Sequence, residues 1–218
     1  EGKLYRFGYN SYGQLGDGTT SANYFNKEMP MSLFGGEKIV YITGTGYQYG
    51  SMYAITESGK LWGWGRNADG QLGLGNTTQQ TTPQHITGVS GSLLENKKVV
   101  HVISSQRGND VTRTWVLTTE GIVYFMGQRE SNGIRTGSYD ANSNNATSPV
   151  GLTNANTLWN SNNQKVIYMS ISGGRYPVLH FITDGGTTGH AQKIYATGSN
   201  NYGQQGTATS TSSGQSGS

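Results

Sequence analysis

The sequence predicts an all-β protein made of β-propeller blades with about four antiparallel strands each. A glycine-marked block occurs four times, and the segments between the copies share the order of their proline, strand and turn residues. No ten-residue window has helical periodicity. Three full units, with partial units at both ends, fit into the 218 residues. We expect a segment of a larger propeller, because an open partial ring would expose sheet edges that natural proteins avoid.

The repeated block ends a strand at a marker glycine and continues into a glycine-rich loop. Residues 2–18 and 59–75 align without a gap, and both contain Gly-Lys-Leu at the start and Gly-Gln-Leu-Gly in the loop. Residues 121–134 and 193–206 are more divergent copies. The repeat lengths are 57, 62 and 71 residues between the marker glycines Gly8, Gly65, Gly127 and Gly198.

The remaining elements of each unit follow in a fixed order. A proline comes first, at a place suited to an edge strand or a strand start, where no ladder donor is lost. A β-branched pair opens the next strand, and an aromatic residue or His followed by two apolar residues and Thr marks the one after. A glycine-containing turn leads to the next marker strand. The corresponding positions are Pro30, Pro83 and Pro149; Ile39, Val99 and Val166; and Tyr53, Trp115 and His180.

The repeats also define the domain organisation. We assign residues 1–206 to the propeller region, with units at about 9–65, 66–127 and 128–198 and partial units at both ends. Residues 207–218 are small and polar, which is typical of a flexible tail or an inter-unit loop. The chain starts at Glu1 without a leader, so we expect a processed product or an excerpt of a longer protein.

Composition narrows the function classes. Only 12% of the residues are charged, about half the usual share. The net charge of +3 is spread along the chain, so no basic cluster indicates nucleic-acid binding. No apolar run is long enough to insert into a membrane. Cysteine is absent, which excludes disulfides, thiolate metal sites and a cysteine nucleophile.

Signals for catalysis or cofactor binding are weak. The four histidines show no metal-ligand spacing, and the Asp-Gly pairs fall in expected turns, where they are favoured for backbone reasons. The glycine-rich loop 70–75 is followed by no helix pattern and no Gly-Lys-Ser/Thr, so tight turns explain it better than phosphate binding. We therefore predict a protein that is not an enzyme, with no catalytic residues, metal or cofactor. The residues considered are His85, His101, His180, His190, Asp17, Asp69 and Asp184.

Aromatic residues in polar loops are the best binding candidates, because tyrosine among Ser, Gly and Asn offers contact area at low entropic cost. The candidate partner-binding residues are Tyr47, Tyr49, Tyr139 and Trp159, with packing against neighbouring loops as the alternative. The widest loop, 131–164, holds two of them and is the best single candidate for an added binding function. Packing is the prediction for the loop residues Tyr9, Tyr12, Tyr24 and Phe25 and for the strand residues Tyr5, Trp62, Trp64, Tyr124 and Tyr195.

Residues 61–75 closely resemble the repeat of the regulator of chromosome condensation family. Residues 7–18 resemble it too, residues 197–206 do so more loosely, and residues 117–121 match a further turn of the family pattern. The resemblance covers nearly the whole chain up to about Gly206. It implies a seven-bladed propeller with glycines in tight loops on one face, although the chain holds three complete units.

The family's best-known activity is nucleotide exchange on a small nuclear GTPase, alongside chromatin binding, and it resides in inserted loops that no loop here matches. We predict a non-catalytic binding or structural module. Low charge and abundant Asn, Ser, Thr, Gly and Tyr are typical of virion or extracellular proteins. The predicted setting is a phage tail or fibre, or another extracellular assembly, that mediates host-surface adhesion or assembly contacts.

The expected partners are other chains of that assembly or a host-surface glycan or protein, without nucleic acid and without membrane insertion. The oligomeric state stays open. Two alternatives remain: a secreted propeller that binds or inhibits a protein, and an exchange factor or scaffold for a small GTPase. Fold alone does not decide among them.

Overall fold

The computed structural model describes residues 3–45, 49–107, 111–128, 145–152, 164–172, 178–186 and 192–198. Within these ranges the regular structure is antiparallel β-sheet, with two short 3₁₀ segments, η1 (Met31–Phe34) and η2 (Ile86–Gly88). The predicted all-β fold class is therefore confirmed. None of the helical segments in the described part of the chain is long and apolar enough to span a membrane.

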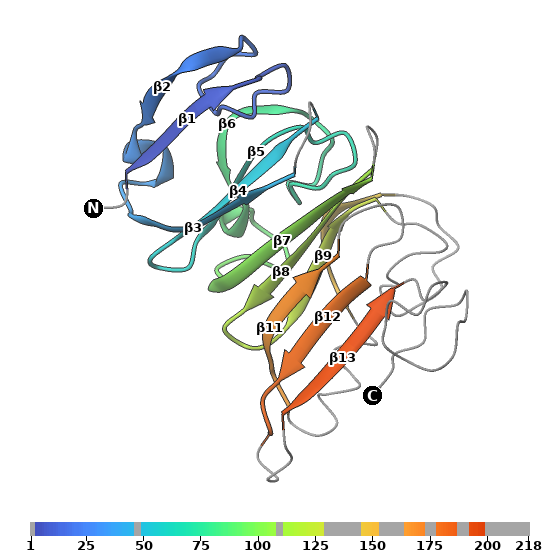
Figure 1. Cartoon of the computed structure of the whole chain (residues 1–218). Helices are drawn as coiled ribbons and strands as arrows, with labels where there is room; N and C mark the ends of the chain where they lie inside the picture. The colour runs from blue at the N-terminus through green and yellow to red at the C-terminus, as the bar shows by residue number, and fades with distance from the viewer. Residues whose placement is uncertain are drawn as a thin grey trace.

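The strands form four sheets that follow one another along the chain (Figure 1). In both four-stranded sheets each strand pairs with the next strand in the sequence. The first complete sheet contains β3 (Ile39–Gly44), β4 (Ser51–Thr56), β5 (Leu61–Gly65) and β6 (Gln80–His85), and the second contains β7 (Val99–Arg107), β8 (Val111–Thr118), β9 (Val123–Gly127) and β10 (Ala146–Gly151). A two-stranded sheet of β1 (Leu4–Gly8) and β2 (Asn23–Met29) precedes them, and a three-stranded sheet of β11 (Val166–Ile171), β12 (Val178–Thr183) and β13 (Lys193–Gly198) follows.

The sheets are out of phase with the sequence repeats. The predicted unit 66–127, for example, begins with β6, which completes the first four-stranded sheet, and continues with β7, β8 and β9 of the second. The marker glycine thus ends the third strand of a sheet, and in the first two copies the glycine-rich part of the motif lies in the loop to the fourth strand. The unit boundaries themselves stay a prediction.

The first strands of three sheets, β3, β7 and β11, lie side by side and share an irregularity. In each, the pairing with the next strand shifts by one residue at the second position, which is Val40, Val100 or Ile167. Such a bulge increases the local twist of a strand. All three of these side chains are exposed.

The prolines behave as expected for two units out of three. Pro83 lies in β6 and Pro149 in β10, and both are edge strands of their sheets, where a missing N–H donor costs no ladder bond. Pro30 instead lies between β2 and η1, where it caps the 3₁₀ segment.

The hydrophobic core is divided into three layers, one at each boundary between neighbouring sheets. Trp64, Tyr53 and Trp115 are among its largest fully buried side chains, and each belongs to a different layer. Tyr124 and Tyr195 are buried as predicted, and Trp62 is half-buried against His85, with 4.8 Å between the ring centroids.

Tyr5 is an exception to the predicted packing of strand aromatics, because 52% of its surface is exposed. It occupies the position of Trp62 and Tyr124 in the complete sheets, counted from the marker glycine. Those two residues are covered because another sheet precedes theirs, whereas in the described part of the chain no sheet precedes β1.

Candidate protein-binding site

A buried asparagine organises both of the described loops that follow a marker glycine, those after Gly8 and Gly65. The Asn67 side-chain oxygen accepts the backbone N–H of Leu72 at 3.0 Å, and its amide nitrogen donates to the carbonyls of Asn76 and Thr78. Asn10 makes the same three kinds of bond in the β1–β2 loop. These bonds satisfy backbone groups that no strand pairs, so they hold each of the two loops in one conformation despite its glycine content.

Glycines in these loops allow close contact with the next sheet. Gly13 and Gly70 both have positive φ, and a Cβ on either would lie 2.7 Å and 2.6 Å from the Cα atoms of Thr81 and Thr147. Two residues after each Gly-Gln-Leu-Gly motif, a backbone N–H donates to the carbonyl of that threonine: Gly18 to Thr81 and Gly75 to Thr147. In both cases, the loop of one sheet therefore packs against the fourth strand of the next sheet.

A buried ion pair joins the two complete sheets. The Asp69 carboxylate accepts a hydrogen bond from the Arg66 guanidinium at 2.5 Å and another from the backbone N–H of Thr112 in β8 at 3.1 Å. The side chains are 11% and 9% exposed. Both charges are used within the protein, so this pair is a structural link rather than a site for a ligand.

Tyr49 is the only one of the four candidate partner-binding residues within the described ranges. Its half-buried ring is tilted against Tyr12, with 5.1 Å between centroids, and covers the Arg66 guanidinium at 5.9 Å. Tyr47, Tyr139 and Trp159 lie outside the described residues, as does most of the loop 131–164. Binding through these residues stays a prediction.

Of the loop aromatics that we expected to pack, the structure exposes three, Tyr9 at 48% and two residues of β2. Tyr24 and Phe25 in β2 are 76% and 81% exposed. The marker glycines Gly8, Gly65 and Gly127 pair with Asn23, Gln80 and Ala146, so the positions equivalent to Tyr24 and Phe25 can be read from this pairing. They hold Thr81–Thr82 in β6 and Thr147–Ser148 in β10. Those small residues leave room for the loop of the preceding sheet. The two bulky rings in their place are a difference between the units that an alignment of the repeats could have found.

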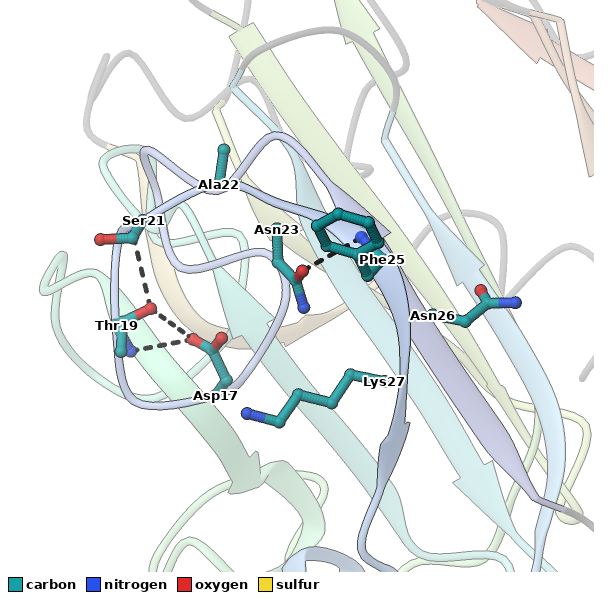
Figure 2. Close-up of a pocket in the computed structure, with 8 residues that line it drawn as sticks. All are labelled: Asp17, Thr19, Ser21, Ala22, Asn23, Phe25, Asn26 and Lys27. Atoms are coloured by element: carbon teal, nitrogen blue, oxygen red, sulfur yellow. Dashed lines mark hydrogen bonds between the residues drawn. The ribbon is translucent and has the colours of Figure 1, made fainter.

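A hollow of about 420 Å³ adjoins Phe25 on the outer side of the β1–β2 loop (Figure 2). Figure 2 shows Asp17 and Thr19 along the loop, and Phe25 and Lys27 on the strand that follows it. The two side chains of opposite charge make the hollow polar. Its open shape and mixed chemistry suit contact with a protein or peptide surface rather than enclosure of a small molecule.

Asp17 contributes a negative charge to this hollow. Its burial alone would raise the pKa of the carboxyl group, but hydrogen bonds from Thr19 and Asn10 and the charge of Arg6 outweigh that effect and lower the pKa. The carboxylate accepts the Thr19 hydroxyl at 2.7 Å and the Thr19 N–H at 3.0 Å. It therefore shapes the loop and stays ionised at neutral pH. Within the described ranges, no three His, Asp or Glu side chains gather as a metal site.

The opposite face of the sheets, at the turns between second and third strands, carries self-paired charges. Lys60 pairs with Glu37, and Lys97 pairs with Glu120 at 2.7 Å. The Lys60 hydrogen bond, with help from the Ser58 hydroxyl, lowers the pKa of Glu37 to about 2. Exposed pairs of this kind contribute little to stability. These two lysines are thus paired within the protein.

Comparison with known proteins finds a similar repeat in part of the chain. The profile of the Regulator of chromosome condensation (RCC1) repeat matches residues 1–48 and 58–108. A human protein named probable E3 ubiquitin-protein ligase HERC4 is 29% identical over 208 residues, which are 95% of this chain and 17% of that protein. The chain therefore spans less than a fifth of that relative.

Two solved structures share the fold. Human WBSCR16 superposes with a TM-score of 0.62 at 20% identity, over 99% of this chain and 48% of its own. Prp20p from Saccharomyces cerevisiae superposes with a TM-score of 0.60 at 21% identity, over 95% of this chain and 43% of its own. At these identities the likeness establishes the propeller architecture alone, and the chain corresponds to less than half of either structure.

Proposed function

We propose that this chain, whose residues 1–48 and 58–108 match the regulator of chromosome condensation (RCC1) repeat, is a non-catalytic protein-binding module of a propeller. We propose further that Tyr24, Phe25 and the adjoining hollow form its partner-binding surface. The observation that carries this proposal is the presence of two large rings, exposed among the residues that the structure describes, at positions where the complete sheets have threonine or serine.

The chemistry of this surface is that of a protein-recognition patch. Tyrosine is enriched among the residues that dominate binding energy, and large rings contribute most when polar groups around them exclude water. Here the polar surround is supplied by Asp17 and Lys27. The strand and the Asn10-braced loop hold the rings on a rigid base, which lowers the entropic cost of binding.

The relatives support a protein partner in general terms. The Prp20p structure was described together with its binding to Gsp1p and histones, so at least one propeller of this shape binds proteins. An exchange factor or scaffold for a small GTPase is therefore our second candidate function. The relatives named above give no support to a phage or other extracellular assembly, so the setting of the protein stays a prediction.

The first experiment replaces the two rings by the residues of the other units. The double variant Tyr24→Thr/Phe25→Thr introduces β-branched side chains, which suit a strand, and Val40→Thr/Val100→Thr is a matched control on exposed residues elsewhere. The partner is captured by chemical cross-linking in extracts and quantified by mass spectrometry. We expect the amount of captured partner to fall at least about tenfold with the first variant alone, which corresponds to a loss of about 1.4 kcal/mol in binding free energy. Equal loss or equal retention in both variants would contradict the proposed surface.

The second candidate is tested with purified small GTPases loaded with fluorescent GDP. Accelerated release of the nucleotide by the chain would support exchange activity, and binding without acceleration would support a scaffold. If no GTPase of a broad panel binds, the second candidate is wrong while the first is unaffected.

A further inference from the structure

The outer edges of the sheets differ in how they are protected against pairing with another strand. In both complete sheets the fourth strand, β6 or β10, lies at the edge, and β2 holds the same place on the outer side of β1. An edge strand presents backbone N–H and C=O groups that a further strand can bind, and natural proteins block such binding with proline, charged side chains or bulges.

Proline protects the edges of the two complete sheets. The first residues of β6 and β10 are Gln80 and Ala146, and the fourth are Pro83 and Pro149. Neither proline has a partner residue in the neighbouring third strand, so each removes an N–H group that the sheet itself does not use. A register shift at this place is common to β2, β6 and β10, so it does not distinguish the three edges.

The fourth residue of β2 is an asparagine. Asn23 begins this strand and pairs with the marker glycine Gly8, as the first residues of β6 and β10 do with theirs, so Asn26 is the equivalent of the two prolines. Asn26 likewise has no partner residue in β1, but it keeps its N–H. The proline of this unit, Pro30, comes after the strand has ended. The edge of β2 thus retains a donor that the other two edges lack.

Charged residues take the place of proline on β2. Lys27 and Glu28 follow Asn26, whereas neither β6 nor β10 contains Lys, Arg, Asp or Glu. The Glu28 carboxylate is paired with Lys3 at 3.2 Å, but Lys27 belongs to none of the ion pairs among the described residues, and its partner residue in β1 is a second cation, Arg6. Opposite charges that face each other on neighbouring strands stabilise the pairing, and like charges destabilise it. Lys27 therefore favours an acidic strand and opposes a basic one.

From these observations we propose that the outer edge of β2 binds an extended strand of a partner protein and that an acidic residue of this strand lies opposite Lys27. Backbone hydrogen bonds, one of them from the Asn26 N–H, supply the affinity, and the charge pair supplies the selectivity. The inference deepens the proposed function and rests on it, because the protein that contacts Tyr24 and Phe25 is the one that supplies the strand.

A random library of displayed short peptides tests this inference without a known partner. It is selected on the unchanged protein, on Lys27→Glu and on the control Val40→Thr/Val100→Thr. We expect the unchanged protein and the control to enrich peptides in which an acidic residue lies among β-branched residues, which favour extended strands. Lys27→Glu is expected to enrich a basic residue in its place. Enrichment of the same peptides by the unchanged protein and Lys27→Glu, or of none by either, would contradict the proposal.

The affinity of the best acidic peptide then measures the contribution of the backbone. Fluorescence anisotropy is expected to show at least about tenfold weaker binding to Asn26→Pro, which removes the N–H from the edge. The prolines at the equivalent positions of β6 and β10 show that such a strand accommodates this residue, and urea denaturation checks that the variant is folded. Equal affinities for the unchanged protein and Asn26→Pro would overturn the proposal.

N-methylation of the peptide gives a test that needs no protein variant. A strand at an edge directs its N–H groups toward its neighbour at every second residue, so methyl groups should weaken binding at alternate positions and have little effect between them. A loss at consecutive positions, or no loss at all, would mean that the peptide does not bind as a strand. Dimerisation of the unchanged chain that Asn26→Pro abolishes would also overturn the proposal, because the edge would then take a second copy.

Cross-linking in extracts separates this inference from the proposed function. Loss of the captured partner with Tyr24→Thr/Phe25→Thr and also with Asn26→Pro would support both. Loss with the ring variant alone would contradict the strand at the edge and leave the proposed surface intact. Loss with Asn26→Pro alone would contradict the ring surface and leave the edge, and retention in both variants would contradict both.

Discussion

The first and second boundaries between sheets share a loop motif but differ in the side chains that hold them. At the boundary between β1–β2 and the first complete sheet, Tyr12 packs on Tyr49, and the Trp64 indole N–H donates to the Gln14 carbonyl at 2.8 Å. At the boundary between the complete sheets, Asp69 stands where Tyr12 stands in the first loop, and it joins Arg66 to the next sheet. The motif thus fixes the backbone, and its variable positions decide whether rings or charges seal the boundary.

The largest effect is expected where the loop backbone meets the next sheet. Gly70→Ala adds a methyl group 2.6 Å from the Thr147 Cα at a residue with φ of +74°. The clash and the positive φ together are expected to cost about 4 kcal/mol of unfolding free energy, measured by urea denaturation. Gly36→Ala is the control, because it has a similar φ and open space, and about 1 kcal/mol is expected there. Equal costs would mean that the contact between sheets is not tight.

Side-chain substitutions at the equivalent variable positions test the difference between the boundaries. Asp69→Ala leaves the buried Arg66 charge and the Thr112 N–H without this partner, so we expect a loss of about 3 kcal/mol. Tyr12→Ala removes a partly exposed ring contact and is expected to cost about 1 kcal/mol. The same denaturation experiment measures both. A larger loss for Tyr12→Ala would reverse our ranking of the two boundaries.

The shared part of the motif should respond alike at both boundaries. Asn10→Ala and Asn67→Ala each remove the hydrogen bonds that the side-chain amide donates, and leave a buried backbone N–H unpaired, at Leu15 and Leu72 respectively. We expect about 2 kcal/mol for each. A difference of more than about 1 kcal/mol between the two variants would show that the loops are not equivalent in energy, despite their equal geometry.

The smallest effect is expected from a histidine that touches the first strands of both neighbouring sheets. Burial lowers the pKa of His101, whose Nε2 lies 3.2 Å from the Tyr41 hydroxyl and whose ring stacks on Tyr168. The unfolded chain therefore binds a proton more readily than the folded one, and stability should fall as pH is lowered from 7 through the unfolded value near 6.5. His101→Gln should flatten this dependence.

A matched variant separates the two half-buried histidines, His85 and His101, in that pH titration. Burial also lowers the pKa of His85, with a further contribution from the charge of Lys60, so His85→Gln should flatten the dependence by its own share. If His101→Gln changes the midpoint but not the pH slope, His101 does not carry the effect.

The sequence predicted the strands well because their signals are local and repeated four times. It could not predict the exposure of Tyr5, Tyr24 and Phe25, since a repeat alignment shows which positions pack in a complete unit but not which face lacks a neighbouring sheet. Asp69 was assigned correctly to a turn. Its bond to the Thr112 N–H joins residues 43 positions apart, and no local pattern records such a contact.

The offset between repeats and sheets has a consequence for how such chains change in evolution. A unit such as 66–127 carries the last strand of one sheet and the first three of the next. If that unit is deleted in a recombination event, β10 follows β5 directly and both flanking pieces still form a four-stranded sheet. The number of blades can therefore rise or fall by whole repeats without any intermediate protein that holds a broken sheet.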